Sequence, residues 1–286
     1  MSLTPYYNQY HTQDSTNYQS YAVGYYNQSV ASQLQAQQRP PVIIAVFGKT
    51  GTGKTTFVRN VTNADYEVGH GLTSQTKVVQ PAEATIEGRK VTLVDTPGFD
   101  DTHLTDREVL KLIADWLKYT YDEGTRLSGL LFFHNISSDR MEGSALKNLH
   151  MFRQLCGDHN LRNVVLTTTK WSVVNEDVGL RREKELIQNF WADMISKGSR
   201  VDRVGNDAHT ATNLVRTFFS NPFFVPQLQQ ELVDGKPLSQ TAAGSEVSRE
   251  IRKIRAEYKK QLADAKAEME QARTKESFER AGTAKK

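Results

Sequence analysis

The chain has 286 residues, of which 38% are hydrophobic, a formal net charge of +3 and one cysteine. This near balance of charge argues against a strongly basic surface for nucleic acid, and a single cysteine excludes an intramolecular disulfide. Its apolar runs fall far short of the ~20 residues that a transmembrane helix needs. The start of the chain lacks a basic and apolar secretion segment, so we expect a cytoplasmic protein, with membrane association unexpected but still open.

Residues 1–39 differ in composition from the rest of the chain. The first 38 contain no Lys or Arg, eight Gln and seven of the eleven Tyr. Such a mixture buries too little aliphatic surface to offset the entropy of ordering, so we expect a disordered tail. The tail is either a passive solvated segment or one that self-associates weakly. Pro40 and Pro41 mark the start of a single core domain, which we place at residues 40–222.

Residues 42–47 predict a buried strand, because the run is short, apolar and rich in β-branched side chains. It leads directly into residues 48–55, which fit the pattern G-x-x-x-x-G-K-[ST] and open into a predicted helix. In this order, backbone N–H groups converge on phosphates, Lys54 adds a positive charge and the Thr55 hydroxyl can ligate Mg²⁺. The predicted nucleotide-binding residues of the loop are Gly48, Thr50, Gly51, Thr52, Gly53, Lys54, Thr55 and Thr56.

Residues 80–87 and 90–94 predict a hairpin through Gly88 and Arg89 that places one antiparallel strand at the sheet edge. The second strand ends in Asp95-Thr96-Pro97-Gly98, which resembles the corresponding segment of translation-factor-like GTPases. A carboxylate at the end of this strand can hold Mg²⁺ opposite Thr55, and the Gly98 N–H can meet a terminal phosphate. Asp95 is therefore a predicted metal ligand.

The following segments alternate between helix and strand patterns. A capping box at Thr105 introduces a helix whose apolar residues recur at helical spacing, and Trp116 and Trp191 are interpreted as core residues. Strands are predicted at 129–133 and 163–167, and further helices run through 146–155, 180–195 and 214–219. This alternation predicts a mostly parallel sheet with helices on both faces.

Residues 223–286 form a C-terminal extension. From Ser245 onward, apolar residues recur at steps of three and four between charged ones, which predicts a long amphipathic helix. We expect this helix to dock on the core domain or a protein partner. The less favoured expectations are, in order, a coiled coil with another copy and binding to an anionic membrane.

Together these segments resemble the septin, Toc and AIG1-like (GIMAP) branch of P-loop GTPases, and within it fungal AIG1-like G-domain proteins. The similarity covers roughly residues 41–245 and rests on segments 48–55, 69–77, 95–101 and 134–141. It implies an α/β fold: a P-loop NTPase G domain with three α/β/α layers, a mostly parallel six-stranded sheet and a C-terminal helical extension. The implied ligands are GTP or GDP with Mg²⁺.

The resemblance also implies catalytic roles. A loop threonine closes over Mg²⁺ and the terminal phosphate, which assigns Thr76, with Thr73 as the alternative. Phe99 stands where many GTPases carry a glutamine that orients water, so a charge from a nucleotide-dependent homodimer is implied, with His103 and His70 as alternatives to Arg107. The implied catalytic residues are Lys54, Thr76, Gly98 and Arg107, and the implied metal ligands are Thr55, Thr76 and Asp95.

Residues 168–172 depart from the usual [NT]-Lys-x-Asp pattern of GTPases, because Ser172 replaces the aspartate that accepts two hydrogen bonds from guanine. We assign Thr169, Lys170 and Trp171 to the base side of the site. Guanine selectivity is expected to weaken unless another group substitutes for the missing carboxylate. The candidate substitutes are Asn175, Glu176 and Asp177.

The predicted function is slow, Mg²⁺-dependent GTP hydrolysis in a nucleotide-controlled switch or assembly protein. One alternative is a nucleotide-gated scaffold with little or no hydrolysis, and another is relaxed GTP/ATP specificity. A small-molecule kinase has a similar phosphate loop, but Asp95-Thr96-Pro97-Gly98 argues against it.

Overall fold

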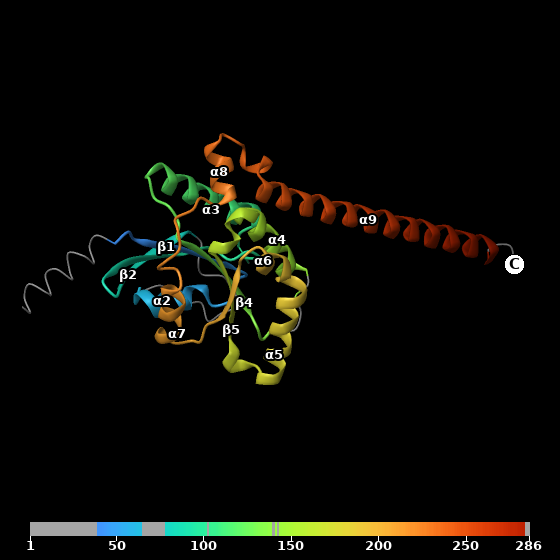
Figure 1. Ribbon diagram of the computed structural model, residues 1–286. Helices are drawn as coiled ribbons and strands as arrows, with labels where there is room; N and C mark the ends of the chain where they lie inside the picture. The colour runs from blue at the N-terminus through green and yellow to red at the C-terminus, as the bar shows by residue number, and fades with distance from the viewer. Residues whose placement is uncertain (1–38, 65–77, 102, 139–140, 142, 284–286) are drawn as a thin grey trace, which may run out of the picture.

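The structure, a computed structural model, describes residues 39–64, 78–101, 103–138, 141 and 143–283, and is built on one six-stranded sheet (Figure 1). The strand order is β2-β3-β1-β4-β5-β6, and all neighbours are parallel except β2 and β3. The strands are β1 (Val42–Gly48), β2 (Gln80–Ile86), β3 (Arg89–Asp95), β4 (Gly129–Asn135), β5 (Val164–Thr169) and β6 (Arg200–Arg203). The predicted mostly parallel α/β fold is confirmed.

Helices cover both faces of this sheet. They are α2 (Lys54–Thr62), α3 (Asp106–Asp122), α4 (Ser144–Cys156), α5 (Glu176–Glu185), α6 (Ala192–Ser196), α7 (Ala208–Arg216), α8 (Gln227–Val233) and α9 (Ala242–Thr283). A π-helical turn, Leu186–Phe190, separates α5 from α6, so the predicted continuous helix over 180–195 is interrupted.

Successive side chains of β1 point to opposite faces of the sheet and so contribute to two separate parts of the core. Ile44 and Val46 point toward α2 and α7, whereas Ala45 and Phe47 point toward α3 and α4. All four are fully buried, because a central parallel strand is covered on both sides. Trp191 is fully buried and Trp116 packs partly buried against the same core, as predicted.

The predicted hairpin and capping box are both present, but the hairpin turn lies at Glu87 and Gly88, one residue before the predicted Gly88 and Arg89, because Arg89 pairs with Ile86. β2 pairs antiparallel with β3 at the edge of the sheet, through Glu87 and Gly88, which have φ angles of 51° and 72°. Thr105 accepts a hydrogen bond from the Glu108 N–H, and the Glu108 carboxylate accepts one from the Thr105 N–H. The capping box therefore fixes where α3 begins.

The segment after α7 returns to the core before α9 leaves it. The Phe224 N–H donates to the Leu127 carbonyl at 3.0 Å, and Leu228, Ala243 and Val247 are buried in the cluster beside α3 and α4. Beyond it, α9 projects away from the body of the molecule (Figure 1).

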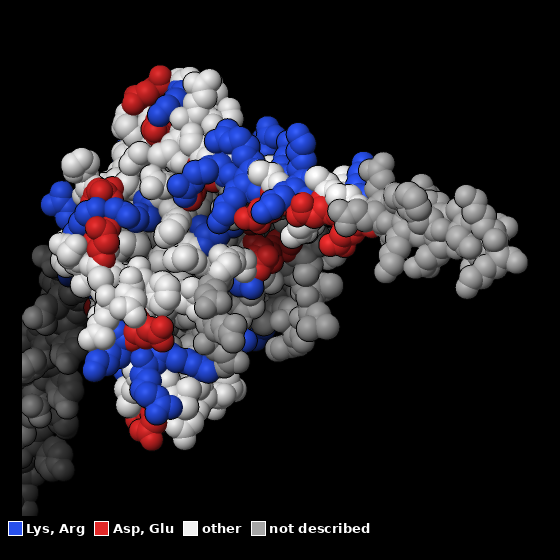
Figure 2. Space-filling view, turned by 90° about the vertical axis from the view of Figure 1, so that its right-hand side faces the viewer, with Lys and Arg blue, Asp and Glu red and all other residues white. Residues whose placement is uncertain are grey.

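The projecting part of α9 is exposed. Lys and Arg side chains gather where the helix leaves the body, interspersed with acidic ones (Figure 2). The exposed basic residues there are Arg252, Lys253, Arg255, Lys259 and Lys260. Tyr258, Leu262 and Met269 are also 59–69% exposed. Among the described residues, no helix is long and apolar enough to span a bilayer.

Candidate nucleotide site

The glycine loop between β1 and α2 has the backbone that its sequence requires. Gly48 has a φ of 139°, and a Cβ there would lie 2.5 Å from the Phe133 carbonyl oxygen, so a side chain cannot be accommodated. Gly53 precedes α2 with a φ of 98°, and no side chain caps the helix. An uncapped helix N-terminus without an acidic residue in its first turn favours an anion.

Lys54 lies at the centre of this loop. Its Nζ donates to the carbonyls of Gly48 and Lys49 at 3.0 and 3.1 Å, and the residue is only 6% exposed. Burial lowers the pKa of Lys54 from 10.5 to about 8, while the nearby carboxylates of Asp95 and Asp101 oppose the shift. An added polyphosphate would favour the charged form further, so the site is suited to an anionic ligand.

Thr55 and Asp95 meet beneath the loop, because β1 and β3 are parallel neighbours and both end at this edge of the sheet. The Thr55 hydroxyl donates to Asp95 Oδ2 at 2.5 Å, and Asp95 is fully buried. Hydroxyl and carboxylate oxygens are ligands that Mg²⁺ accepts. The described part of the chain contains no group of three His, Cys, Asp or Glu side chains that could hold a metal. Mg²⁺ commonly binds through one or two protein ligands together with phosphates and water, so the Thr55–Asp95 pair suits this ion.

The segment after Asp95 lies directly against the glycine loop. A Cβ on Gly98 would lie 2.4 Å from Thr50 Oγ1, and the Thr50 N–H donates to the Phe99 carbonyl at 3.3 Å. The Phe99 side chain is fully buried in the core beside α3. Phe99 therefore serves as a core residue.

Thr169 connects the end of β5 to the glycine loop. Its hydroxyl lies 2.8 Å from the Thr52 carbonyl oxygen and 3.3 Å from that of His134, so one proton serves two buried acceptors. Lys170 follows with a φ of 60° and an exposed side chain. Of the predicted base-side residues, Thr169 thus joins the loop and Lys170 faces solvent.

Trp171 packs beneath α5. Its Nε1 donates to the Thr168 hydroxyl at 3.0 Å, and the Arg203 guanidinium lies 4.1 Å from the ring centroid. Glu183 accepts three hydrogen bonds from the same guanidinium, two from Nε at 2.9 and 3.0 Å and one from Nη2. A Cβ on Gly179 would lie 2.7 Å from the ring. The indole is therefore held by α5 and β6.

The candidate substitutes for the missing aspartate lie at the start of α5. Ser172 is exposed. Asn175 accepts from the N–H groups of Asp177 and Val178 and so serves as the cap of α5. Glu176 and Asp177 lie in the first turn of that helix and are exposed.

The remaining predicted catalytic residues are either outside the described residues or exposed near the start of α3. Thr76 falls outside the described residues, as do the alternatives Thr73 and His70. Arg107 is exposed in the first turn of α3, and His103 is exposed just before that helix.

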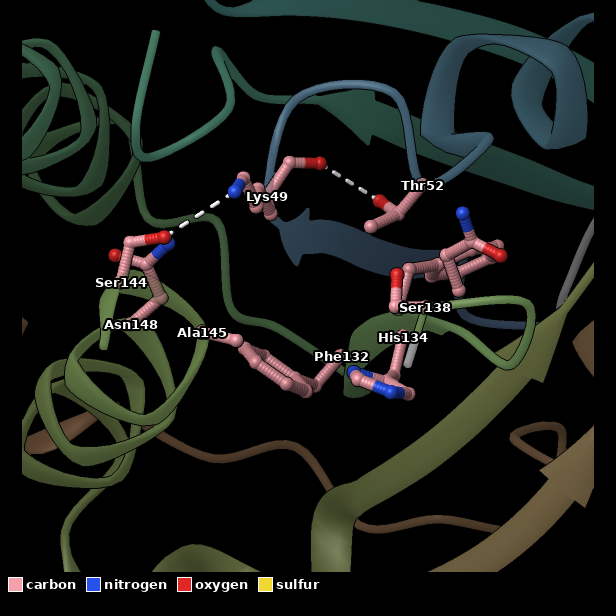
Figure 3. Close-up of a pocket in the computed structure, with 10 residues that line it drawn as sticks. Lys49, Thr52, Phe132, His134, Ser138, Ser144, Ala145 and Asn148 are labelled. Carbon is pink, nitrogen blue, oxygen red and sulfur yellow. Dashed lines mark hydrogen bonds between the residues drawn. The ribbon is translucent and has the colours of Figure 1, made fainter. Parts of the chain in front are cut away.

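A polar cluster beside the glycine loop was not predicted from the sequence. Lys49 Nζ lies 2.7 Å from an Asp100 carboxylate oxygen and donates to Ser144 Oγ at 3.1 Å (Figure 3). Hydrogen bonds to the Asp100 carboxylate from Lys49, and next from Ser144, hold the pKa of Asp100 below its usual value. The cluster joins the glycine loop, the segment after Gly98 and the start of α4. No local motif signals it, because the three residues come from separate segments.

The sequence of the central segment matches a known family. Residues 43–166 fit the model of the family described as 50S ribosome-binding GTPase. These residues have the fold of a P-loop GTPase G domain. GTPase Der from Solidesulfovibrio magneticus is 42% identical over 60 residues, which are 21% of this chain and 14% of that protein. The chain thus spans a small part of this relative.

Solved structures support the same fold. Toc33 from Arabidopsis thaliana, as a dimerization-deficient mutant, is 16% identical, with a TM-score of 0.53 over 68% of this chain and 91% of its own. The complex of Toc33 with Mg²⁺ and GMPPNP is 16% identical, with a TM-score of 0.51 over 70% and 88% of the two chains. The likeness establishes the fold, including the six-stranded sheet and the helices that flank it.

Proposed function

We propose that this chain is a guanine-nucleotide-controlled switch or assembly GTPase that hydrolyses GTP slowly. The observation that carries the proposal is the convergence of the buried Lys54 ammonium with the Thr55–Asp95 pair under a helix N-terminus. Lys54 would balance charge on the phosphates, and the loop N–H groups would orient them. Thr55 and Asp95 would hold Mg²⁺, which neutralises charge that develops on the phosphate oxygens.

Guanine is the proposed base, in keeping with the family description and with the GTPase that shares the 60-residue match. The exposed Lys170 side chain lies at the end of β5, where it can cover a purine face. Without a carboxylate at Ser172, the preference for guanine over adenine should be reduced by an order of magnitude or more, since an unpaired polar group costs about 1–3 kcal/mol.

Slow hydrolysis is proposed because Phe99 is buried in the core and cannot orient water. Thr76 is proposed to close over the terminal phosphate, and Arg107 to supply charge across a nucleotide-dependent homodimer. Dimerization is important for the GTPase activity of the chloroplast translocon components atToc33 and psToc159. An AIG1-like affiliation within the P-loop GTPases is proposed on segments 48–55 and 95–101.

A second candidate function is a nucleotide-gated scaffold with little or no hydrolysis. The observation that favours it is α9, a helix of 42 residues whose exposed part carries Tyr258, Leu262 and Met269. Exposed apolar side chains on one helix are suited to a protein partner or to a coiled coil with a second copy.

Calorimetric titration of the purified chain with GDP, GTP, ADP and ATP, with Mg²⁺ and then with EDTA, tests the proposed ligand. Tight binding of guanine nucleotides that weakens in EDTA is expected. Equal affinity for ADP would remove guanine specificity, and no binding of any purine nucleotide would overturn the proposal.

Single-turnover GTP hydrolysis, measured across a range of protein concentrations, distinguishes an assembly GTPase from a scaffold with little or no hydrolysis. A rate that rises with concentration supports an assembly GTPase. A rate that is indistinguishable from uncatalysed GTP hydrolysis at every concentration favours the scaffold.

A further inference from the structure

The turn after β5 is held in a conformation that its own residues disfavour. Lys170 has φ and ψ angles of 60° and 35°, in the left-handed region that a residue with a Cβ rarely adopts. Such a conformation persists only where the surrounding contacts determine it. Lys170 is also the residue proposed to cover the purine face. The contacts that hold this turn therefore determine where the Lys170 side chain can reach.

Four side chains form a closed network around the turn, which we call the Arg203 network. Trp171 Nε1 donates to the Thr168 hydroxyl at 3.0 Å, and that hydroxyl donates to Glu183 Oε1 at 3.1 Å. Arg203 closes the network, because its guanidinium donates to both Glu183 carboxylate oxygens and lies 4.1 Å from the Trp171 ring centroid. The indole next to Lys170 is thus fixed from β5, α5 and β6 together.

Arg203 also joins this turn to a second loop. β5 and β6 are parallel neighbours with Thr168 in register with Arg203, so the segments that follow both strands lie at the same edge of the sheet. The Val204 N–H donates to the Thr168 carbonyl at 3.0 Å, and residues 205–207 then lead into α7. Ligands of open α/β sheets bind at the carboxyl ends of the strands. Arg203 therefore fixes the spacing of two loops at the edge where the proposed base binds.

We propose that Arg203 is a positioning residue for the nucleotide base. It holds Trp171, and through Trp171 the Lys170 turn, without touching the base itself. This role rests on the proposed guanine-nucleotide site and goes beyond the phosphate loop and the 168–172 segment. Arginine suits the role, because a planar guanidinium can stack on an indole while its N–H groups make paired hydrogen bonds to a carboxylate. Without the network, binding would have to reorder the turn, at a cost in affinity.

The test compares Arg203→Ala with the unmodified chain, using GDP and inorganic tripolyphosphate with Mg²⁺. Tripolyphosphate carries the charge of the phosphates but has no base, and its affinity is measured by displacement of bound GDP. We expect the affinity for GDP to fall about tenfold in calorimetry, while the affinity for tripolyphosphate stays within about twofold. An equal loss for both ligands, or no loss for GDP, would overturn the proposal.

Arg200→Ala is the matched control. Arg200 lies on the same strand, and its guanidinium also lies over an aromatic ring, that of Phe218, at 5.5 Å from the centroid. Phe218 belongs to the part of the core beside α2 and α7, so this variant loses the same kind of contact without changing the Lys170 turn. GDP affinity should stay within about twofold. A loss equal to that of Arg203→Ala would show general damage to β6 and contradict the assignment.

A conservative variant keeps the test decisive if Arg203→Ala does not fold. Glu183 is 7% exposed, and removing its partner leaves a buried carboxylate uncompensated. Arg203→Lys keeps a positive charge opposite Glu183 but lacks the planar fork. We expect this variant to fold and to lose about threefold or more in GDP affinity, with tripolyphosphate affinity unchanged. Unchanged GDP affinity in folded Arg203→Lys would overturn the positioning role. Failure of the proposed function is distinguishable, since GDP would then not bind the unmodified chain.

Discussion

Replacement of Lys54 by methionine should separate ligand binding from stability. The ammonium is buried, and in the nucleotide-free chain its pKa falls from 10.5 to about 8. Since a tenfold change in a protonation constant corresponds to about 1.36 kcal/mol, holding this group charged in the folded state costs about 3 kcal/mol. Methionine removes the charge and keeps a similar length.

The sign of the pH effect follows from linkage. Because the folded pKa is depressed, the unfolded chain binds more protons than the folded chain between pH 8 and 10.5, and stability rises with pH in that window. Relative to Lys54→Met, the free energy of unfolding of the unmodified chain should therefore increase by about 3 kcal/mol across the window. The hydrogen bonds to the Gly48 and Lys49 carbonyls are lost in the variant at every pH, so they shift the difference without creating this slope.

Urea denaturation of both chains without nucleotide, from about pH 7 to 10.5, measures this difference directly. Other lysines and tyrosines titrate in both chains and cancel. A difference that stays constant with pH would refute the argument that burial depresses the pKa. In a parallel series, GDP should stabilise the unmodified chain by about 2.7 kcal/mol at one hundred times its Kd, and should not stabilise the variant.

Four further changes test other parts of the structure. Phe99→Ala should destabilise the chain by about 3–5 kcal/mol in urea denaturation because it leaves a cavity in the core, and a loss below about 1 kcal/mol would show that the ring is not buried. Asp95→Asn should remove most of the Mg²⁺ dependence of GDP affinity measured by calorimetry, and an unchanged dependence would exclude a metal role. Ser172→Asp should raise the ratio of GDP to ADP affinity by about tenfold or more, and an unchanged ratio would show that this position does not face the base. Thr105→Ala should lower the free energy of unfolding by about 1 kcal/mol, because the variant loses the N-terminal cap of α3. Thr125→Ala, outside any helix, is the matched control. Equal effects of the two substitutions would argue against capping.

Local patterns predicted most of the fold. The glycine loop, the β2–β3 hairpin and the start of α3 each depend on residues close together in the chain, and all three appear in the structure. β6 was not predicted, because its four residues, Arg-Val-Asp-Arg, are half-exposed or exposed and carry little apolar signal. The break between α5 and α6 was also missed, since a π-helical turn keeps apolar side chains near helical spacing.

The site was harder to predict wherever tertiary contacts determine side-chain direction. The sequence shows Phe99 where many GTPases carry a glutamine, but it does not indicate where the Phe99 side chain points. In the structure the Phe99 carbonyl accepts a hydrogen bond from the Thr50 N–H, and the ring is buried in the core. The Lys49–Asp100–Ser144 cluster joins residues up to 95 positions apart. Contacts between such distant segments leave no periodic signal in the sequence.

The length of α9 determines how far its end would move if the helix tilted. Its first turns pack against α4, and α4 begins at Ser144, which contacts the glycine loop through Lys49. At 1.5 Å per residue, positions 252–283 reach about 48 Å from that anchor, so a tilt of about 5° would sweep the far tip through about 4 Å. A rigid helix mounted in this way would convert a small shift of α4 into a much larger displacement of its far end.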